Sequence, residues 1–220
     1  MDDRSPLGLD RRSLLRGIAG AGALAAAGQL LTPGSALAAP ATPRIYSCDE
    51  WGARTVSGLT TLNNKANRIL VHHIASANST DYSLAHAKQV ARNDQADHMD
   101  NNGWADTGQH FTISRGGYIM EGRHGSLAAL RARNRMIRGA HCPGQNDNAI
   151  GIENEGTYTS ADPPQAMWNA LVSMCAYVCY QYGIPASNIS GHRDHYATAC
   201  PGERFYAKLA QLRKEVAAKL

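Results

Sequence analysis

The chain has 220 residues, of which 43% are hydrophobic and 18% are charged, and its formal net charge is +4. This length and composition are typical of one globular domain that buries a full hydrophobic core. The charge is small and the sequence has no block of Lys and Arg, which makes nucleic acid a poor candidate for a partner.

The first 38 residues have the pattern of a twin-arginine export signal. Arg11 and Arg12 precede a stretch from 17 to 43 without a charged residue, and Ala36 and Ala38 form a small-x-small cleavage pattern. A membrane anchor is the alternative, but the stretch is rich in Gly and Ala and lacks the roughly twenty strongly apolar residues of a spanning helix. We therefore expect an exported protein, secreted or associated with the cell wall, without stable membrane insertion after cleavage.

After this signal we expect a Pro-containing linker at 39–47 and one domain at 48–220. Residues 68–74 are apolar and β-rich, which predicts a buried strand. Residues 82–99 have helical spacing, and the turn residues Asp100 to Gly103 end that helix.

The second half of the domain continues this alternation of strands and helices. Residues 110–114 and 118–123 flank a Gly-rich turn and predict a hairpin, and 150–154 predicts another strand. Two amphipathic helices follow, one from Pro163 and Pro164 to Tyr182 and one over 203–219. The sequence thus predicts a single α/β domain with a central mixed β-sheet flanked by helices.

The five cysteines leave two interpretations open. If Cys200 binds a metal, four remain, which is an even number for an oxidising compartment. Cys175 and Cys179 share one helix face, so we expect disulfides from them to Cys48 or Cys142 before a bond between the two. The alternative is that one or both are small core residues.

The segment 191–202 holds residues that zinc prefers. Imidazole nitrogen and thiolate sulfur are zinc ligands, and a catalytic zinc takes three protein ligands and leaves one position for water. His192 and Cys200 can supply two ligands from a loop that folds back over the metal. His72, near the end of an expected strand, is a candidate for the third, although a lone strand histidine is usually a core residue.

Five motifs occur in an order known from one superfamily. The chain resembles the zinc-dependent N-acetylmuramoyl-L-alanine amidases of the superfamily that includes phage lysozyme-type amidases and peptidoglycan recognition proteins. The match runs from about Trp51 to Cys200. The residues that carry it are His72 after Ile69-Leu70-Val71, Gly108-Gln109-His110-Phe111, Gly139-Ala140-His141, Ala149-Ile150-Gly151-Ile152-Glu153, and His192 with Thr198-Ala199-Cys200-Pro201.

The resemblance implies a zinc ion held by His72, His192 and Cys200, in a groove at one edge of the sheet face. Strand alternation places His73 on the face opposite His72, so only one of the pair can reach the metal.

The resemblance also implies that Glu153 is the catalytic carboxylate, which takes a proton from water and passes it to the leaving amine. By strand alternation Glu153 and Glu155 share a face, so the pattern alone does not choose between them. A surface ion pair at the strand end is the alternative to catalysis for Glu153.

Three further residues are expected to contact substrate. Gln109 replaces a Tyr that many relatives carry, and Thr198 replaces the Lys of the phage-type enzymes. Neither side chain supplies an acidic proton, so they are expected to position water or to hydrogen-bond the developing oxyanion. His141 matches a residue that lines the groove in the family, and a structural role beside Cys142 is its alternative.

The sequence therefore predicts an exported, monomeric peptidoglycan hydrolase that cleaves the amide between N-acetylmuramic acid and L-alanine of the stem peptide. The alternative is a peptidoglycan recognition module without catalysis. Members of that type typically lack the Cys ligand, and this chain has Cys200. A general zinc peptidase is disfavoured because no His-Glu-x-x-His motif is present.

Overall fold

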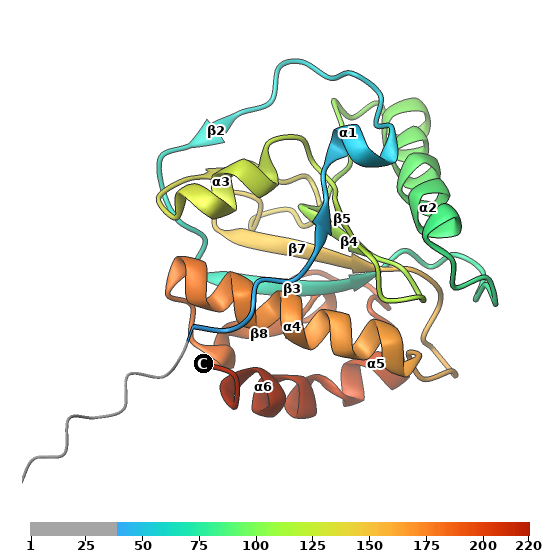
Figure 1. Ribbon diagram of the computed structural model, residues 1–220, viewed down its shortest axis with the longest axis vertical. Helices are drawn as coiled ribbons and strands as arrows, with labels where there is room; N and C mark the ends of the chain where they lie inside the picture. The colour runs from blue at the N-terminus through green and yellow to red at the C-terminus, as the bar shows by residue number, and fades with distance from the viewer. Residues whose placement is uncertain (1–38) are drawn as a thin grey trace, which may run out of the picture. The chain divides into compact units, whose positions relative to one another are not determined.

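The computed structural model describes residues 39–220, so the expected export signal lies outside the described part of the chain. A six-stranded mixed sheet forms its centre, with the strand order β1-β5-β4-β7-β3-β8 (Figure 1). Within this six-stranded sheet, only the β4–β5 pair is antiparallel. The strands are β1 (Ile45–Tyr46), β3 (Arg68–His73), β4 (Phe111–Ile113), β5 (Ile119–Glu121), β7 (Ala149–Asn154) and β8 (Ile189–Gly191); β2 (Thr61–Leu62) and β6 (Met136–Ile137) form a separate antiparallel pair.

Six α-helices surround the sheet in residues 39–220, and the two longest lie within the ranges that the sequence predicts. Ser83 caps α2 by accepting a hydrogen bond from the His86 N–H. Gly183 ends α4 at a φ of 73°, which favours glycine. The helices are α1 (Cys48–Trp51), α2 (Leu84–Ala96), α3 (Ser126–Ala132), α4 (Gln165–Tyr182), α5 (Glu203–Ala207) and α6 (Leu209–Ala217), with a π-helical turn at Asp97–Asn101 and 3₁₀ turns at Ala186–Asn188 and His192–Asp194.

Alternation along the central strands divides the sheet into two different faces. Ile69 and Val71 of β3 belong to the main hydrophobic core, together with Ile150 and Ile152 of β7. The intervening residues point to the other face. That face therefore carries His72 from β3 and, from β7, the carboxylate of Glu153.

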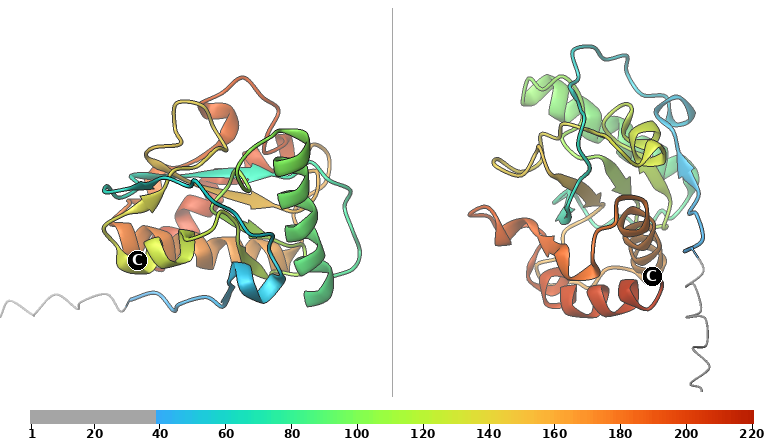
Figure 2. Two further views of the ribbon diagram at one scale, coloured as in Figure 1. Left: turned by 90° about the horizontal axis from the view of Figure 1, so that it is seen from above. Right: turned by 90° about the vertical axis from the view of Figure 1, so that its left-hand side faces the viewer.

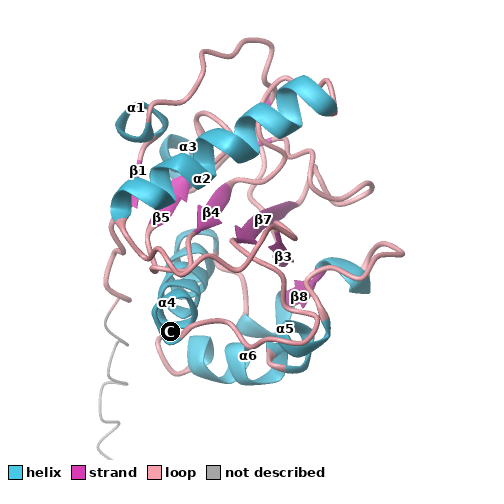
Figure 3. Ribbon diagram, turned by 90° about the vertical axis from the view of Figure 1, so that its right-hand side faces the viewer, coloured by secondary structure: helices cyan, strands magenta, loops and turns pink. Residues whose placement is uncertain are grey.

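Helices cover both faces (Figure 3). On one face, α4 and α6 supply the main core with apolar side chains that include Leu171, Val178 and Leu212. On the other face, α2 packs through Ala87 and Ala91 against the end of the sheet nearest β5. The predicted single α/β domain with a central mixed sheet between helices is confirmed.

Two elements differ in kind from the sequence prediction. Residues 45–46 of the expected linker form β1, which pairs with β5, and Ile45 is buried. The predicted helix over 203–219 is broken at Lys208 into α5 and α6. Within residues 39–220 no helix is long and apolar enough to cross a membrane.

The expected disulfides are absent from the described residues, where all five cysteines are free. Cys175 and Cys179 both point from α4 into the main core, whereas Cys48 and Cys142 lie in two separate apolar clusters. The prediction of disulfides was wrong, because a helix face that looked available for cross-linking is the face that packs on the sheet. The alternative interpretation, small buried core residues, describes them correctly.

Candidate metal and amidase site

The carboxyl ends of three neighbouring parallel strands carry the expected site residues. β7, β3 and β8 are adjacent and parallel. His72 and Glu153 lie opposite one another near the ends of β3 and β7, and His192 follows β8 directly. Two loops add further residues: the loop after β8 carries Cys200, and the loop before β7 carries His141. Both loops lie on the same face of the sheet (Figure 2). Open α/β sheets bind their ligands at this end of the strands.

The three expected metal ligands come together at this position. One ligand atom from each of His72, His192 and Cys200 lies within 4.8 Å of the others, and the Cys200 sulfur is 3.8 Å from His72 Nδ1. A tetrahedral zinc with bonds of 2.0–2.3 Å separates its ligand atoms by roughly 3.4–3.6 Å. His192 Nε2 is buried and has no hydrogen-bond partner among residues 39–220. A buried ring nitrogen without a partner, on a residue of this three-residue group, fits the expected ion.

The backbone around Cys200 holds its sulfur toward the two histidines. The His73 N–H donates to the sulfur over 3.4 Å, and the Thr198 hydroxyl accepts from the Cys200 N–H over 3.2 Å. Burial raises the pKa of the Cys200 thiol to about 12, although the hydrogen bond from His73 lowers it. The charge of Arg193 also lowers this pKa. The thiol must lose its proton to bind zinc.

His141 lies within the same cluster but at a different place from the one expected. It is buried, and its Nδ1 is 3.0 Å from Nε2 of His72. Burial and the neighbouring histidines lower the pKa of both rings well below the usual value, so both are neutral. The structure places His141 behind a metal-ligand candidate rather than on a free surface.

Glu153 has the environment of a functional carboxylate. Its carboxylate makes no hydrogen bond to any group in residues 39–220, in contrast to that of Glu155. Glu155 lies past the end of β7 and accepts from the backbone N–H of Arg115, with its other oxygen 2.7 Å from His86 Nε2. Burial, with the charges of two nearby aspartates, raises the pKa of Glu153 well above its ordinary 4.5. A perturbed carboxyl group beside a metal-type cluster is typical of an acid–base residue.

A second group that the sequence analysis missed adjoins Glu153. Ligand atoms of Asp94, His98 and Glu153 lie within 4.8 Å of one another. Asp94 is buried and its pKa is raised, chiefly by burial. The four-residue spacing of Asp94 and His98 on one helix face was the available signal, but nothing in the sequence placed the end of this helix beside Glu153.

Gln109 is fully buried beside this group, which differs from its expected contact with substrate. Its amide nitrogen donates to Asp94 and, over 2.8 Å, to the Thr112 hydroxyl. Thr112 is paired in register with Glu153. Gln109 therefore holds the polar cluster behind the carboxylate, and a substrate outside the protein does not reach it.

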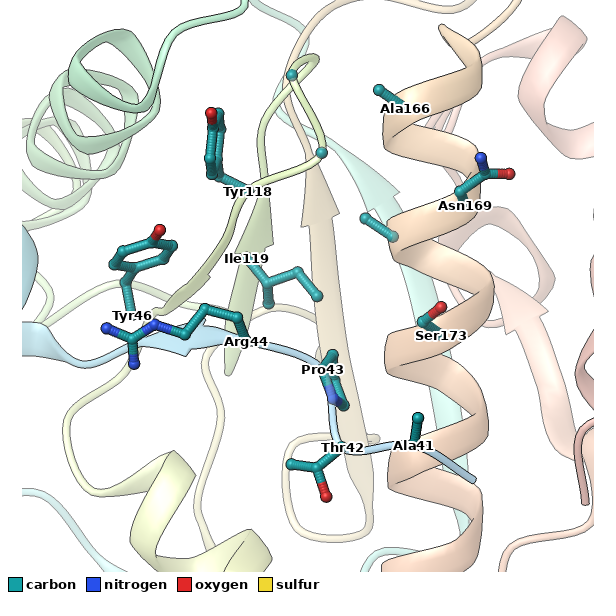
Figure 4. Close-up of a pocket in the computed structure, with 13 residues that line it drawn as sticks. Ala41, Thr42, Pro43, Arg44, Tyr46, Tyr118, Ile119, Ala166, Asn169 and Ser173 are labelled. Atoms are coloured by element: carbon teal, nitrogen blue, oxygen red, sulfur yellow. The ribbon is translucent and has the colours of Figure 1, made fainter. Parts of the chain in front are cut away.

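One pocket lies away from these residues. Its volume is about 470 Å³, and it is bounded by the segment 41–46, by the β4–β5 turn and by α4 (Figure 4). Arg44 and Tyr46 line one side, and Asn169 and Ser173 of α4 line the other. None of the expected metal, catalytic or substrate residues lines this pocket.

Comparison with known proteins agrees with the arrangement of these residues. Residues 62–203 match the family model described as N-acetylmuramoyl-L-alanine amidase. The chain belongs to this family. The amidase-family match spans every residue expected in the site, from His72 to Cys200.

Relatives in the family carry two kinds of name. Peptidoglycan-recognition protein LB of Drosophila melanogaster is 30% identical over 171 residues, which cover 77% of this chain and 69% of the relative. A human protein named N-acetylmuramoyl-L-alanine amidase is 29% identical over 169 residues, which cover 74% of this chain but only 27% of that protein. Both names occur at nearly equal identity.

Solved structures of the amidase family share the fold described above. Drosophila PGRP-LB superposes with a TM-score of 0.67 at 30% identity, covering 77% of this chain and 94% of that structure. The ectodomain complex of PGRP-LCa and PGRP-LCx with bound tracheal cytotoxin gives a TM-score of 0.67 at 26% identity, covering 77% and 95%.

Proposed function

We propose that the chain is an exported, zinc-dependent N-acetylmuramoyl-L-alanine amidase that cleaves the amide between N-acetylmuramic acid and L-alanine in peptidoglycan. The observation that carries this proposal is the convergence of His72, His192 and Cys200 beside the unpartnered carboxylate of Glu153. The family supplies the bond to be cleaved, and the site supplies groups suited to cleaving it.

The residues of the site divide the reaction between them. When bound by the three ligands, zinc supplies a Lewis acid that polarises a carbonyl and activates water. Glu153 accepts the proton of the attacking water and returns it to the leaving amine. A raised pKa suits both steps, since a group that titrates nearer the working pH can bind and release a proton. Gln109 and Asp94 hold the polar surroundings of Glu153 in place.

Recognition of peptidoglycan without catalysis is the second candidate, because several relatives are named recognition proteins. The presence of Cys200 favours catalysis. A binding module needs neither a sulfur ligand nor an unpaired carboxylate beside it, and a carboxylate that lacks a partner is costly to keep where burial removes part of its water.

Mass spectrometry of peptidoglycan digested by the zinc-loaded protein tests the proposal. We expect stem peptides with a free L-alanine amino group and intact glycan strands, together with about one zinc per chain by elemental analysis. Cys200→Ser is the control and should lose both retained zinc and product. Binding to peptidoglycan without released peptide would assign the chain to recognition, and cleaved glycan strands would contradict the amidase assignment.

A further inference from the structure

The two ring nitrogens of His141 are both engaged inside the protein. Nδ1 lies 3.0 Å from Nε2 of His72, and Nε2 lies 3.3 Å from the carbonyl oxygen of Ala149. The side chain is buried. A histidine with both nitrogens occupied has no polar atom left for substrate.

These contacts fix where each hydrogen lies. A carbonyl oxygen only accepts, so His141 must carry its hydrogen on Nε2, and its Nδ1 in the neutral ring is then an acceptor. His72 must therefore carry its hydrogen on Nε2 to donate to His141. The lone pair of His72 is left on Nδ1, the nitrogen that lies 3.8 Å from the Cys200 sulfur.

Two glycines make room for the His141 ring. A Cβ atom on Gly151 of β7 would lie 2.5 Å from Cγ of His141, and one on Gly139 would lie 2.7 Å from its Cδ2. The backbone is held as well, because Asn146 Oδ1 accepts from the His141 N–H over 2.9 Å. Any residue larger than glycine at position 139 or 151 would therefore enter the space that the His141 ring occupies.

We propose that His141 is a positioning residue that fixes the ring orientation and tautomer of His72, so that Nδ1 of His72 is presented to the metal. This inference rests on the proposed zinc site and deepens it. Partners of this kind commonly change metal affinity by 10- to 100-fold. The backbone carbonyl of Ala149 can only accept a hydrogen bond. It therefore fixes which nitrogen donates and which accepts in the chain from His72 through His141 to Ala149.

Zinc affinity, measured by competition with a chelator, tests the role of His141. His141→Phe keeps a ring in the same space but cannot accept from His72, so we expect zinc to bind about 10- to 100-fold more weakly. His141→Gln should recover most of this loss, since its amide oxygen can accept from His72 while its NH₂ donates to Ala149. Denaturation of the metal-free variants reports separately on folding.

Equal zinc affinity for the parent and His141→Phe would overturn the inference while leaving the amidase proposal intact. Equal losses in His141→Phe and His141→Gln would also overturn it, because they would indicate a packing role. Failure of the parent to bind zinc would contradict the proposed function itself. Nitrogen-15 NMR of the metal-free parent gives a test without substitution: we expect the His72 hydrogen on Nε2, and a hydrogen on Nδ1 would contradict the proposal.

Discussion

At the scale of single residues, two glutamates close together in sequence have different surroundings. Glu155 is fully buried and is held by His86 and the Arg115 backbone, whereas Glu153 has no such partner. Strand alternation alone left this choice open. The structure separates the two because β7 ends at Asn154, so the alternation does not extend to Glu155.

The proposed proton transfer predicts opposite results for the two glutamates. Glu153→Gln should lower kcat by roughly 10²- to 10⁴-fold, because the amide cannot accept and return a proton. Its zinc content and substrate binding should persist. Steady-state kinetics with zinc measured on the same samples checks this expectation.

Glu155→Gln is the matched control. It should keep its activity per folded molecule but lose about 1–3 kcal/mol of stability, since it replaces a buried acceptor of two hydrogen bonds. A near-parental kcat for Glu153→Gln, or a loss of kcat in Glu155→Gln alone, would show that Glu153 is not the proton carrier.

At the scale of elements, the sequence predicted the strands and long helices that build the site. The β-rich stretch at 68–74 became β3, and the predicted hairpin became β4 and β5. The side-chain surroundings were harder to predict. Gln109 is buried where α2 brings Asp94 to it. Contacts between elements distant in sequence leave no periodic pattern.

The two cysteines of α4 also have surroundings that the sequence did not predict, and their state as free thiols can be tested. Since Cys175 and Cys179 are free core residues, a reductant should leave the thermal unfolding midpoint of the metal-free protein unchanged. Thiol titration in denaturant without reductant should find all five thiols. A lowered midpoint or a titration of one or three thiols would show that cross-links form.

At the scale of the whole molecule, the buried acids of the site make folding stability depend on pH. A carboxyl group whose pKa is raised by folding binds its proton more tightly in the folded state. Its contribution is most favourable below the unfolded pKa and is lost as pH rises toward the folded pKa. Glu153 and Asp94 both have raised pKa values, chiefly through burial.

Glu153→Gln should therefore make the metal-free protein more stable than the parent at pH 7. The gain should shrink as pH falls toward 4.5, the ordinary pKa of Glu153. Urea denaturation of the parent and the variant at several pH values measures this difference. The buried histidines are present in both proteins, so their contributions to the pH dependence cancel. A gain that grows on acidification would have the wrong sign and would contradict the raised pKa.

The proposed export route concerns residues outside the described part of the chain and has its own test. Residues 1–44 fused to a folded reporter should direct it out of the cytoplasm. Replacing both Arg11 and Arg12 by Lys should abolish export, because the route depends on the arginine pair. Equal export of the reporter with and without the pair would rule out a twin-arginine signal.

One face of the central sheet packs in the hydrophobic core and the other carries the site residues, which affects how activity can change within this family. Stability depends on the positions of β3 and β7 that face α4 and α6, and chemistry depends on the positions between them. Each set can therefore accept substitutions while the other stays constant. A lineage could lose hydrolysis and keep its architecture, or refine its core and keep its reaction. Relatives of this chain carry names for recognition and names for catalysis.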